Sequence, residues 1–204
     1  MPADPLQRIE GKYEILSKLK EGGMGAIYKV RHRLLDEVRV VKLMRPQLLE
    51  NADLQARFVR EARFAIKLRH PNVAQIYDFT VDEEDGTAFI VMEFIDGLTL
   101  EEVLAAHGPP PLGLTLEIAQ QSLRALGYLH GKGFIHRDIS PDNLILTAGA
   151  DGEPLVKLID LGIAKAVEAG GQGLTQTGTF LGKVRYASPE QFGTEDANRV
   201  DGRG

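Results

Sequence analysis

Two kinds of hydrophobic pattern follow one another along the chain. Short runs of alternating or β-branched residues come first and are typical of strands. They cover residues 13–19, 26–31, 38–43, 73–80 and 87–93. Longer runs with helical spacing cover residues 51–68, 99–106 and 114–130. Because most strands precede most helices, the pattern predicts an α+β chain in two lobes that are joined near residues 94–97.

The helix expected over residues 51–68 has a single apolar face. Apolar residues three or four positions apart lie on one side of a helix. On this helix they are Leu54, Phe58, Ala62, Ala65 and Ile66. The sequence His-Pro-Asn at 70–72 stops the helix. We therefore expect one amphipathic helix between the third and fourth strands.

Composition and charge narrow the functional classes. The 204 residues can form a domain with a substantial core, and 43% of them are hydrophobic. The net charge of −5 provides no broad cationic field for nucleic acid or anionic lipid. No apolar run approaches the roughly 20 residues that span a bilayer, and residues 1–11 do not resemble a signal peptide. The absence of cysteine fits the reducing cytoplasm, where we expect the protein.

Residues that can carry chemistry concentrate between positions 136 and 160. The segment HRDISPDNLIL places Asp138 five residues before Asn143, and Asp160 follows a second apolar run. Carboxylate and amide oxygens on loops at the ends of β-like segments suit Mg²⁺, which takes few protein ligands besides substrate phosphates. A further carboxylate held apart from the metal is able to accept a proton from a hydroxyl. The spacing therefore predicts a magnesium site and a separate proton-accepting carboxylate.

These residues resemble the protein kinases, whose catalytic loop reads HRDLxxxxN and whose magnesium loop reads DFG. The resemblance implies a two-lobed fold, with an N-terminal antiparallel sheet plus one helix and a helical C-terminal lobe. It also implies ATP and Mg²⁺ as cofactors and Ser or Thr hydroxyls of proteins as acceptors. The implied parts are a leader (1–12), an N-terminal lobe (13–93), a hinge (94–97) and a partial C-terminal lobe (98–204) with an activation segment (160–190).

Gly22, Gly23 and Gly25 lie between two expected strands, in the sequence LKEGGMGAIY. Glycines let backbone amides approach phosphate oxygens without a Cβ in the way, but the same residues also form hairpin turns. The glycine loop of the kinases, GxGxxGxV, loses its first glycine here because Lys20 stands at that position. GGMG followed by Tyr28 resembles the eukaryotic-like Ser/Thr kinases of bacteria.

A lysine and a glutamate far apart in the sequence are assigned to the phosphates. By resemblance Lys42, in VVK, holds the α- and β-phosphates, and Glu61 forms the ion pair that directs its ammonium. A lysine on a strand is more often a solvated side chain. The co-occurrence with Glu61 on the expected helix favours the functional interpretation.

The resemblance also assigns the adenine site. Val40 replaces a family alanine and, with the loop residue Ile27, should narrow the slot that holds the ring. Met92 would guard the back pocket, and the backbone of Glu93 and Ile95 would hydrogen-bond adenine. Taken together, the nucleotide-contacting residues implied outside the glycines and Lys42 are Leu19, Ile27, Val40, Met92, Glu93, Ile95 and Ile145.

The catalytic end of the site is assigned in the same way. Asp138 would orient and deprotonate the acceptor hydroxyl, while Asn143 and Asp160 would bind Mg²⁺. His136 would pack beneath the loop as a structural residue. Leu161 replaces the phenylalanine of DFG and keeps its apolar packing role.

Two departures from the family pattern form a pair. The usual loop, HRDLKPxN, has a lysine that contacts the γ-phosphate, and Ser140 takes its place. In GTxxYxSPE the family has a threonine that meets this lysine, and here that position is Lys183. We interpret the pair as an exchange in which Lys183 supplies the catalytic ammonium. The alternative is that both positions are relaxed and the kinase is weak or inactive.

Threonines in the expected activation segment are candidates for autophosphorylation. Thr175, Thr177 and Thr179 lie in LTQTGTF. A phosphate group adds negative charge and seeks an arginine, and Arg137 is the partner implied by the resemblance.

The resemblance extends from Tyr13 to the last residue, where the family begins the helix that anchors its C-terminal lobe. We therefore expect a kinase domain truncated in that lobe. Two other functions remain alternatives. One is a nucleotide-binding regulatory pseudokinase, favoured by Lys20, Ser140 and Lys183, and the other is a small-molecule phosphotransferase of similar fold.

Overall fold

The described residues form two compact units. The computed structural model describes residues 9, 11–23, 25–45, 52–82, 87–162 and 184–186. The first unit comprises Met1–Lys67 and Gln75–Phe94, and the second comprises Leu68–Ala74 and Ile95–Gly204. In the part of the chain that is described, no helix combines the length and apolar character needed to cross a bilayer.

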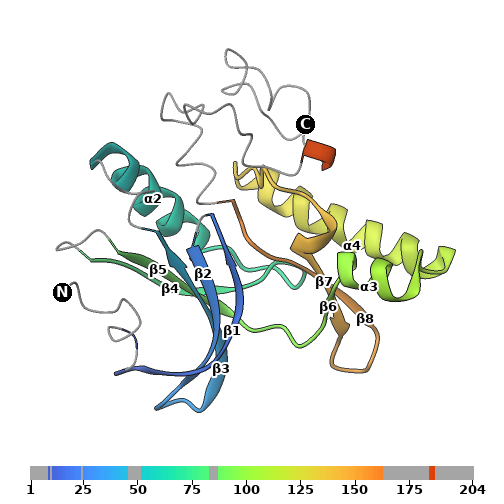
Figure 1. Ribbon diagram of the computed structural model, residues 1–204. Coiled ribbons are helices and arrows are strands. Elements are labelled where there is room, and N and C mark those ends of the chain that lie inside the picture. The colour runs from blue at the N-terminus through green and yellow to red at the C-terminus, as the bar shows by residue number, and fades with distance from the viewer. Residues whose placement is uncertain are drawn as a thin grey trace. The chain divides into compact units, whose positions relative to one another are not determined.

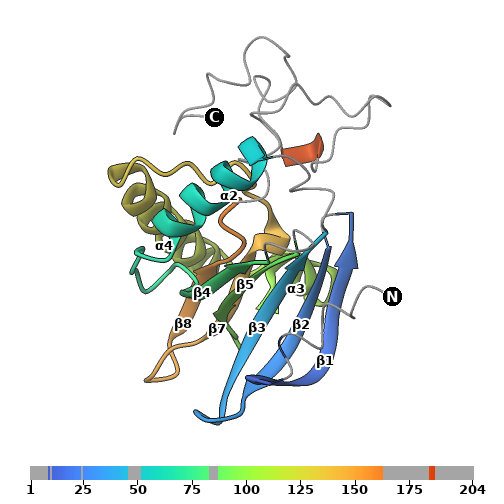
Figure 2. The same ribbon diagram turned by 90° about the vertical axis from the view of Figure 1, so that its left-hand side faces the viewer.

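In its described residues, the first unit consists of a five-stranded antiparallel sheet and helix α2 (Figures 1 and 2). Its strands run in the order β1-β2-β3-β5-β4, and each neighbouring pair is antiparallel. The elements are β1 (Tyr13–Gly22), β2 (Gly25–His32), β3 (Glu37–Met44), α2 (Ala52–Ala65), β4 (Ile76–Val81) and β5 (Ala88–Glu93). The antiparallel sheet and single helix expected for the N-terminal lobe are confirmed.

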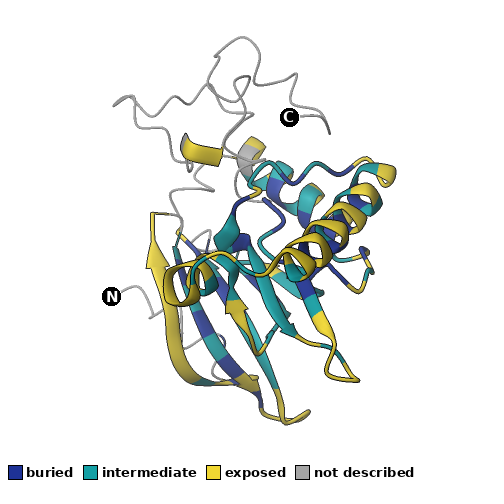
Figure 3. Ribbon diagram, turned by 90° about the vertical axis from the view of Figure 1, so that its right-hand side faces the viewer, coloured by how far each residue is buried: buried dark blue, intermediate teal, exposed yellow. Residues whose placement is uncertain are grey.

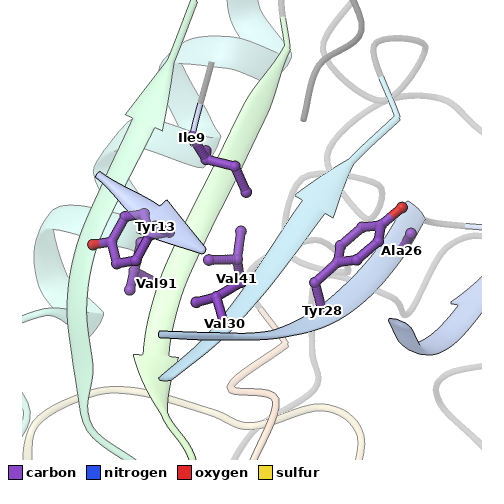
Figure 4. Packing of buried hydrophobic residues seen from close by; sticks show 7 residues of the cluster. All are labelled: Ile9, Tyr13, Ala26, Tyr28, Val30, Val41 and Val91. Carbon is purple, nitrogen blue, oxygen red and sulfur yellow. The ribbon is translucent and has the colours of Figure 1, made fainter. Parts of the chain in front are cut away.

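The two faces of this sheet have different roles. One face carries a buried hydrophobic cluster, shown in Figure 4. Its members are Ile9, Tyr13, Ala26, Tyr28, Val30, Val41 and Val91. Because side chains alternate along a strand, Lys42 lies on the opposite face from Val41. Cross-strand pairing places Ile27 and Ile90 beside Lys42 on that face.

Helix α2 covers the face that carries Lys42. Phe58, Ala62 and Ala65 are buried, as the apolar spacing predicts. The ring of Phe58 meets that of Phe79 on β4 edge to face, with centroids 6.4 Å apart. Phe79 pairs with Ile90, which in turn pairs with Lys42, so α2 and the lysine share one side of the sheet. The helix ends at Ala65, three residues before the predicted end, and the side chain of Leu54 lies outside the described residues.

The second unit combines two helices with a small antiparallel sheet. Its elements are β6 (Leu98–Thr99), α3 (Leu100–His107), α4 (Leu112–Gly131), the 3-10 turn η2 (Pro141–Asn143), β7 (Leu144–Ala148), β8 (Pro154–Leu158) and the 3-10 turn η3 (Val184–Tyr186). Strand β7 follows the loop that carries Asp138 and Asn143, and β8 precedes the loop that carries Asp160. These two segments are called the first and second acidic loops. Figure 3 shows that α4 has a buried side and an exposed side. Its buried residues are Ile118, Gln121, Ala125 and Leu129.

The strand expected over residues 73–80 begins only at Ile76. The reason is that the preceding backbone pairs with β8. Leu158 donates its N–H to the carbonyl of Asn72 at 2.9 Å, and its own carbonyl accepts from the N–H of Ala74 at 2.9 Å. Residues 68–74 thus belong to the second unit, although both flanking stretches belong to the first.

A buried polar network fastens β8 to α4. The Oε1 atom of Gln121 accepts hydrogen bonds from Asn72 Nδ2 at 2.7 Å and from the N–H of Val156 at 2.8 Å. Its Nε2 atom donates to the carbonyl of Pro154 at 2.8 Å. Asn72 Nδ2 also donates to the carbonyl of Val156 at 2.9 Å. Because β8 leads directly to Asp160, this network fixes the start of the second acidic loop.

Replacing the central glutamine should expose the cost of this network. In Gln121→Leu the N–H of Val156 and the carbonyl of Pro154 lose their buried partner. We expect the free energy of unfolding to fall by about 2–4 kcal/mol, measured by urea denaturation. Gln120→Leu, at an exposed position one residue earlier on α4, is the matched control and should stay within about 0.5 kcal/mol of wild type. Equal losses in the two variants would show that the network contributes nothing specific.

Candidate active site

The loop from His136 to Asn143 is held by side chains rather than by regular secondary structure. Arg137, with φ 62°, has a left-handed backbone that residues other than glycine rarely adopt. The ring of His136 is 1% exposed, and its Nε2 donates to the carbonyl of Ile159 at 3.0 Å. The carbonyl oxygen is an acceptor only, so the proton resides on Nε2. His136 therefore ties the loop to the residue that precedes Asp160, as expected of a structural histidine.

Asn143 connects both acidic loops. Its Nδ2 donates to the backbone carbonyl of Asp138 at 2.8 Å and to Oδ2 of the same residue at 3.1 Å. Its own carbonyl accepts from the N–H of Ile159 at 2.9 Å. The side chain is buried, so these bonds are shielded from competing water. The structure thus brings Asp138 and Asn143 together and anchors the strand end that carries Asp160.

The second acidic loop turns sharply after β8. Asp160 and Gly162 have φ values of 55° and 60°, and the Gly162 N–H donates to the carbonyl of Asp160 at 2.6 Å. A Cβ at Gly162 would collide with the carbonyl oxygen of His136, so only glycine fits this position. Leu161 between them is 4% exposed, in agreement with the packing role expected of it.

The oxygen atoms in these loops fit a hard divalent cation. The two bonds from Nδ2 of Asn143 to Asp138 orient the amide, and its Oδ1 is a candidate metal ligand. The Asp160 carboxylate is the second candidate ligand. Within the described ranges no group of three or more His, Asp or Glu side chains is arranged to hold a metal ion. The residues therefore suit Mg²⁺ bound by two protein ligands together with phosphate oxygens, and they do not suit an all-protein metal cage.

The glycine turn lies at the end of the β1–β2 hairpin. Gly22 pairs with Gly25 across the hairpin, and Gly25 has φ 140°. A Cβ at Gly25 would collide with the carbonyl oxygen of Leu43, so the hairpin itself requires this glycine. Around Gly22 there is open space to at least 4 Å, and packing does not require a glycine there. Gly25 thus has a structural explanation, whereas the role of Gly22 at the phosphates stays a prediction.

Lys42 shares one face of the sheet with three of the residues assigned to the adenine slot, Ile27, Val40 and Met92. Lys42 is 7% exposed. Val40 lies two residues before it on the same strand and pairs with Met92 of β5, while Ile27 pairs with Lys42 itself. Leu19, on β1, is 49% exposed. This face is opposite the hydrophobic cluster, so the side chains of Ile27, Val40 and Met92 lie on the same side of the sheet as Lys42.

Glu61 forms an ion pair with its neighbour in the sequence. Glu61 lies on α2, on the same side of the sheet as Lys42. Its Oε1 pairs with the guanidinium of the neighbouring Arg60 at 3.4 Å, and no ion pair links it to Lys42 among the described residues. The assigned ion pair between Lys42 and Glu61 therefore stays a prediction. In this structure the carboxylate of Glu61 is paired with Arg60.

Three residues assigned to adenine lie near the end of β5 and on β7. The N–H of Glu93 donates to the carbonyl of Gln75 at 2.8 Å, and its Oε2 accepts from the Gln75 N–H at 3.0 Å. These bonds fix the end of β5. Ile95 begins the second unit, where Ile145 on β7 pairs with Thr99. Gln75 itself belongs to no motif, and its partner Glu93 lies 18 residues away, so no local pattern predicted this pair.

Ser140 has a partner that sequence reasoning missed. Its hydroxyl is 2% exposed and donates to Oδ1 of Asp142 at 2.6 Å. The remaining assigned residues, namely Lys183 and the threonines at 175, 177 and 179, lie outside the described residues.

Comparisons with known proteins agree with this geometry. The family model for the protein kinase domain matches residues 13–201. Serine/threonine-protein kinase pkn3 of Myxococcus xanthus is 40% identical over 182 residues, which are 88% of this chain and 33% of that protein. Serine/threonine-protein kinase PrkC of Bacillus subtilis is 37% identical over 185 residues, which are 91% of this chain and 27% of that protein. The chain thus spans about a third or less of these curated relatives.

Solved structures give the same result for the fold. The kinase domain of Mycobacterium tuberculosis PknI has a TM-score of 0.63 at 30% identity, over 74% of this chain and 60% of that one. Rad53 residues 1–466 in complex with AMP-PNP has a TM-score of 0.72 at 27% identity, over 93% of this chain and 44% of that one. Taken with the family match over nearly all of the sequence, these likenesses show that the chain belongs to the protein kinase domain family.

Proposed function

We propose that this chain transfers the γ-phosphoryl group of ATP, with Mg²⁺, to Ser or Thr hydroxyls of proteins. The observation that carries the proposal is the pair of hydrogen bonds from Asn143 to Asp138. They place a candidate metal ligand directly beside a candidate proton acceptor, which is the arrangement that phosphoryl transfer to a hydroxyl needs. The names of the relatives as serine/threonine-protein kinases favour protein acceptors over small molecules.

Asp138 acts on the acceptor hydroxyl. A carboxylate has two oxygens with about four acceptor sites, so the bond from Asn143 to Oδ2 orients the group without exhausting its capacity as an acceptor. The carboxylate positions the hydroxyl for in-line attack and takes up its proton as the new bond to the γ-phosphorus forms, while the bond from that phosphorus to the β-phosphate oxygen breaks and ADP leaves. Its contribution falls on turnover rather than on nucleotide binding.

Asn143 Oδ1 and the Asp160 carboxylate would hold the metal ion. When bound, Mg²⁺ neutralises the charge on the phosphate oxygens. The tie between Asn143 and Ile159 keeps the two ligands in register, because Ile159 immediately precedes Asp160. Loss of a hydrogen bond that holds a metal ligand in place typically costs about 10–100-fold in metal affinity.

Residues of the first unit would hold the nucleotide. The backbone of Gly22, Gly23 and Gly25 approaches phosphate oxygens, and the open space around Gly22 supports this role. Lys42 supplies the cation for the α- and β-phosphates. The adenine ring would be bound by the apolar side chains and backbone assigned to it: Leu19, Ile27, Val40, Met92, Glu93, Ile95 and Ile145.

Three further parts of the proposal rest on sequence alone. Lys183 supplies the ammonium that the Ser140 position lacks. A phosphorylated threonine of the activation segment would form an ion pair with Arg137. An ATP-dependent enzyme without cysteine fits the cytoplasm.

A nucleotide-binding module without transferase activity is the second candidate. The ion pair of Glu61 with Arg60 favours it, because the family requires the glutamate at Lys42 in its active state. Binding of ATP without any incorporation of phosphate into protein would identify this function.

Charge removal at the phosphates should abolish transfer. In the full-length protein, Lys42→Met and Asp160→Asn should each lower phosphate incorporation into a generic protein substrate at least about 100-fold, since positioned charge lowers the barrier by several kcal/mol. Lys132→Met and Asp151→Asn, both at exposed positions, are the matched controls and should keep normal rates. A near-normal rate in either site variant would refute the roles assigned here.

Asp138→Asn separates catalysis from binding. Because Asp138 addresses the acceptor and not the nucleotide, this variant should bind ATP with affinity within about twofold of wild type and lose at least about 100-fold in turnover. Equilibrium binding of a fluorescent ATP analogue, measured beside the kinase assay, tests both values. A parallel loss of affinity would mean that Asp138 contributes to the nucleotide site.

Incubation with ATP and Mg²⁺ should label the activation segment. We expect phosphate between residues 175 and 179, most of it on Thr175 or Thr177, because these hydroxyls lie in the segment that Arg137 serves. Mass spectrometry of peptides from the incubated protein provides the test. Phosphate found only outside residues 160–190 would contradict the assignment.

A further inference from the structure

Ser140 lies where the kinase family has a phosphate-contacting lysine, yet its surroundings are not those of an empty lysine site. Its side chain is 2% exposed, and its hydroxyl donates to Oδ1 of Asp142 at 2.6 Å. A short bond from a hydroxyl to a carboxylate in an enclosed setting is among the stronger hydrogen bonds in proteins. A relaxed surface position would have neither the burial nor the partner.

The same residue also closes the 3-10 turn η2. Ser140 precedes the turn with an extended backbone, φ −160° and ψ 159°, and Pro141 occupies the first position of the turn. The carbonyl of Ser140 accepts from the N–H of Asn143 at 3.0 Å. Ser140 thus makes a side-chain bond to Asp142 and a backbone bond to Asn143. Together these two bonds restrain the three residues of η2.

Asn143 transmits this restraint to the rest of the site. Its side chain holds the carbonyl and carboxylate of Asp138, and its carbonyl holds the N–H of Ile159, next to Asp160. Any change in the geometry of η2 moves the amide of Asn143 and, with it, the orientation of Asp138. Loop geometry of this kind matters because a misplacement of about 1 Å can cost 10²-fold in rate.

We propose that the Ser140–Asp142 hydrogen bond is a clamp that sets Asn143 and Asp138 in their working positions, so that Ser140 is a positioning residue in this kinase. The inference rests on the proposed phosphoryl transfer and assigns the serine a role within the same site. A hydroxyl has one proton to donate, and that of Ser140 goes to Asp142. The serine thus supports the loop from within and does not stand in for the lysine at the phosphate.

Two variants remove the clamp from either side. In the full-length protein, each of the variants Ser140→Ala and Asp142→Ala should lower kcat at least about tenfold. The KM for ATP should stay within about twofold of the wild-type value. The double variant should lose no more than the single variants, because the two residues share one interaction. Asp142→Asn keeps an acceptor oxygen and should retain kcat within about threefold of wild type.

Ser122→Ala is the control for deletion of a half-buried serine hydroxyl. Ser122 donates to the carbonyl of Ile118 on α4 at 2.8 Å, away from the loop, and its removal should leave kcat unchanged. Additive losses in the double variant, or normal kcat in Ser140→Ala, would overturn the clamp.

Amide hydrogen exchange tests the clamp independently of activity. The N–H groups of Asn143 and Ile159 are both hydrogen-bonded within the clamped assembly, so Ser140→Ala should speed their exchange at least about tenfold relative to wild type and to Ser122→Ala. If the wild-type protein incorporated no phosphate, the proposed function would fail and this exchange would still decide the clamp. Unchanged exchange at both amides would overturn it.

Discussion

The candidate active site depends on the hydrogen bonds that Asn143 makes to Asp138. Asp138, Asn143 and Asp160 lie outside the strands, where no ladder of backbone hydrogen bonds fixes their positions. Within these loops, Arg137 and Asp160 adopt left-handed backbones. A loop of this shape keeps one conformation only when surrounding groups over-determine it. Asn143 does so by binding the backbone and the carboxylate of Asp138 at once, and His136 adds a second tie to Ile159.

The fold beneath the site supplies two kinds of support. In the second unit, the Gln121 and Asn72 network fixes β8 with satisfied buried polar groups, and the glycine at 162 allows the backbone to pass the carbonyl of His136. In the first unit, the hydrophobic cluster occupies one face of the sheet and leaves Lys42 on the other. Sheets and helices thus hold the candidate nucleotide-binding residues, while the two acidic loops derive their shape from a few side-chain hydrogen bonds.

Periodicity and motifs predicted the parts that depend on neighbours in the sequence. Strands, the amphipathic helix with Phe58 and Ala62, and the spacing from Asp138 to Asn143 all follow local rules. The parts that depend on distant partners had no such signal. Residues 73–75 have strand-like character, yet the backbone of 72–74 pairs with Leu158, more than 80 positions later. Likewise, the substitution at Ser140 suggests a lost lysine when the motif is considered alone, and only the structure shows its bond to Asp142.

Binding of a divalent cation is the measurement that most directly tests the claim that Asn143 and Asp160 form one metal site. Mn²⁺ can replace Mg²⁺ and its free concentration is measurable by electron paramagnetic resonance. With a non-hydrolysable ATP analogue present, we predict that Asn143→Ala and Asp160→Asn each weaken Mn²⁺ binding at least about tenfold, while Asp151→Asn leaves it unchanged. Wild-type affinity for Mn²⁺ in either site variant would contradict the account.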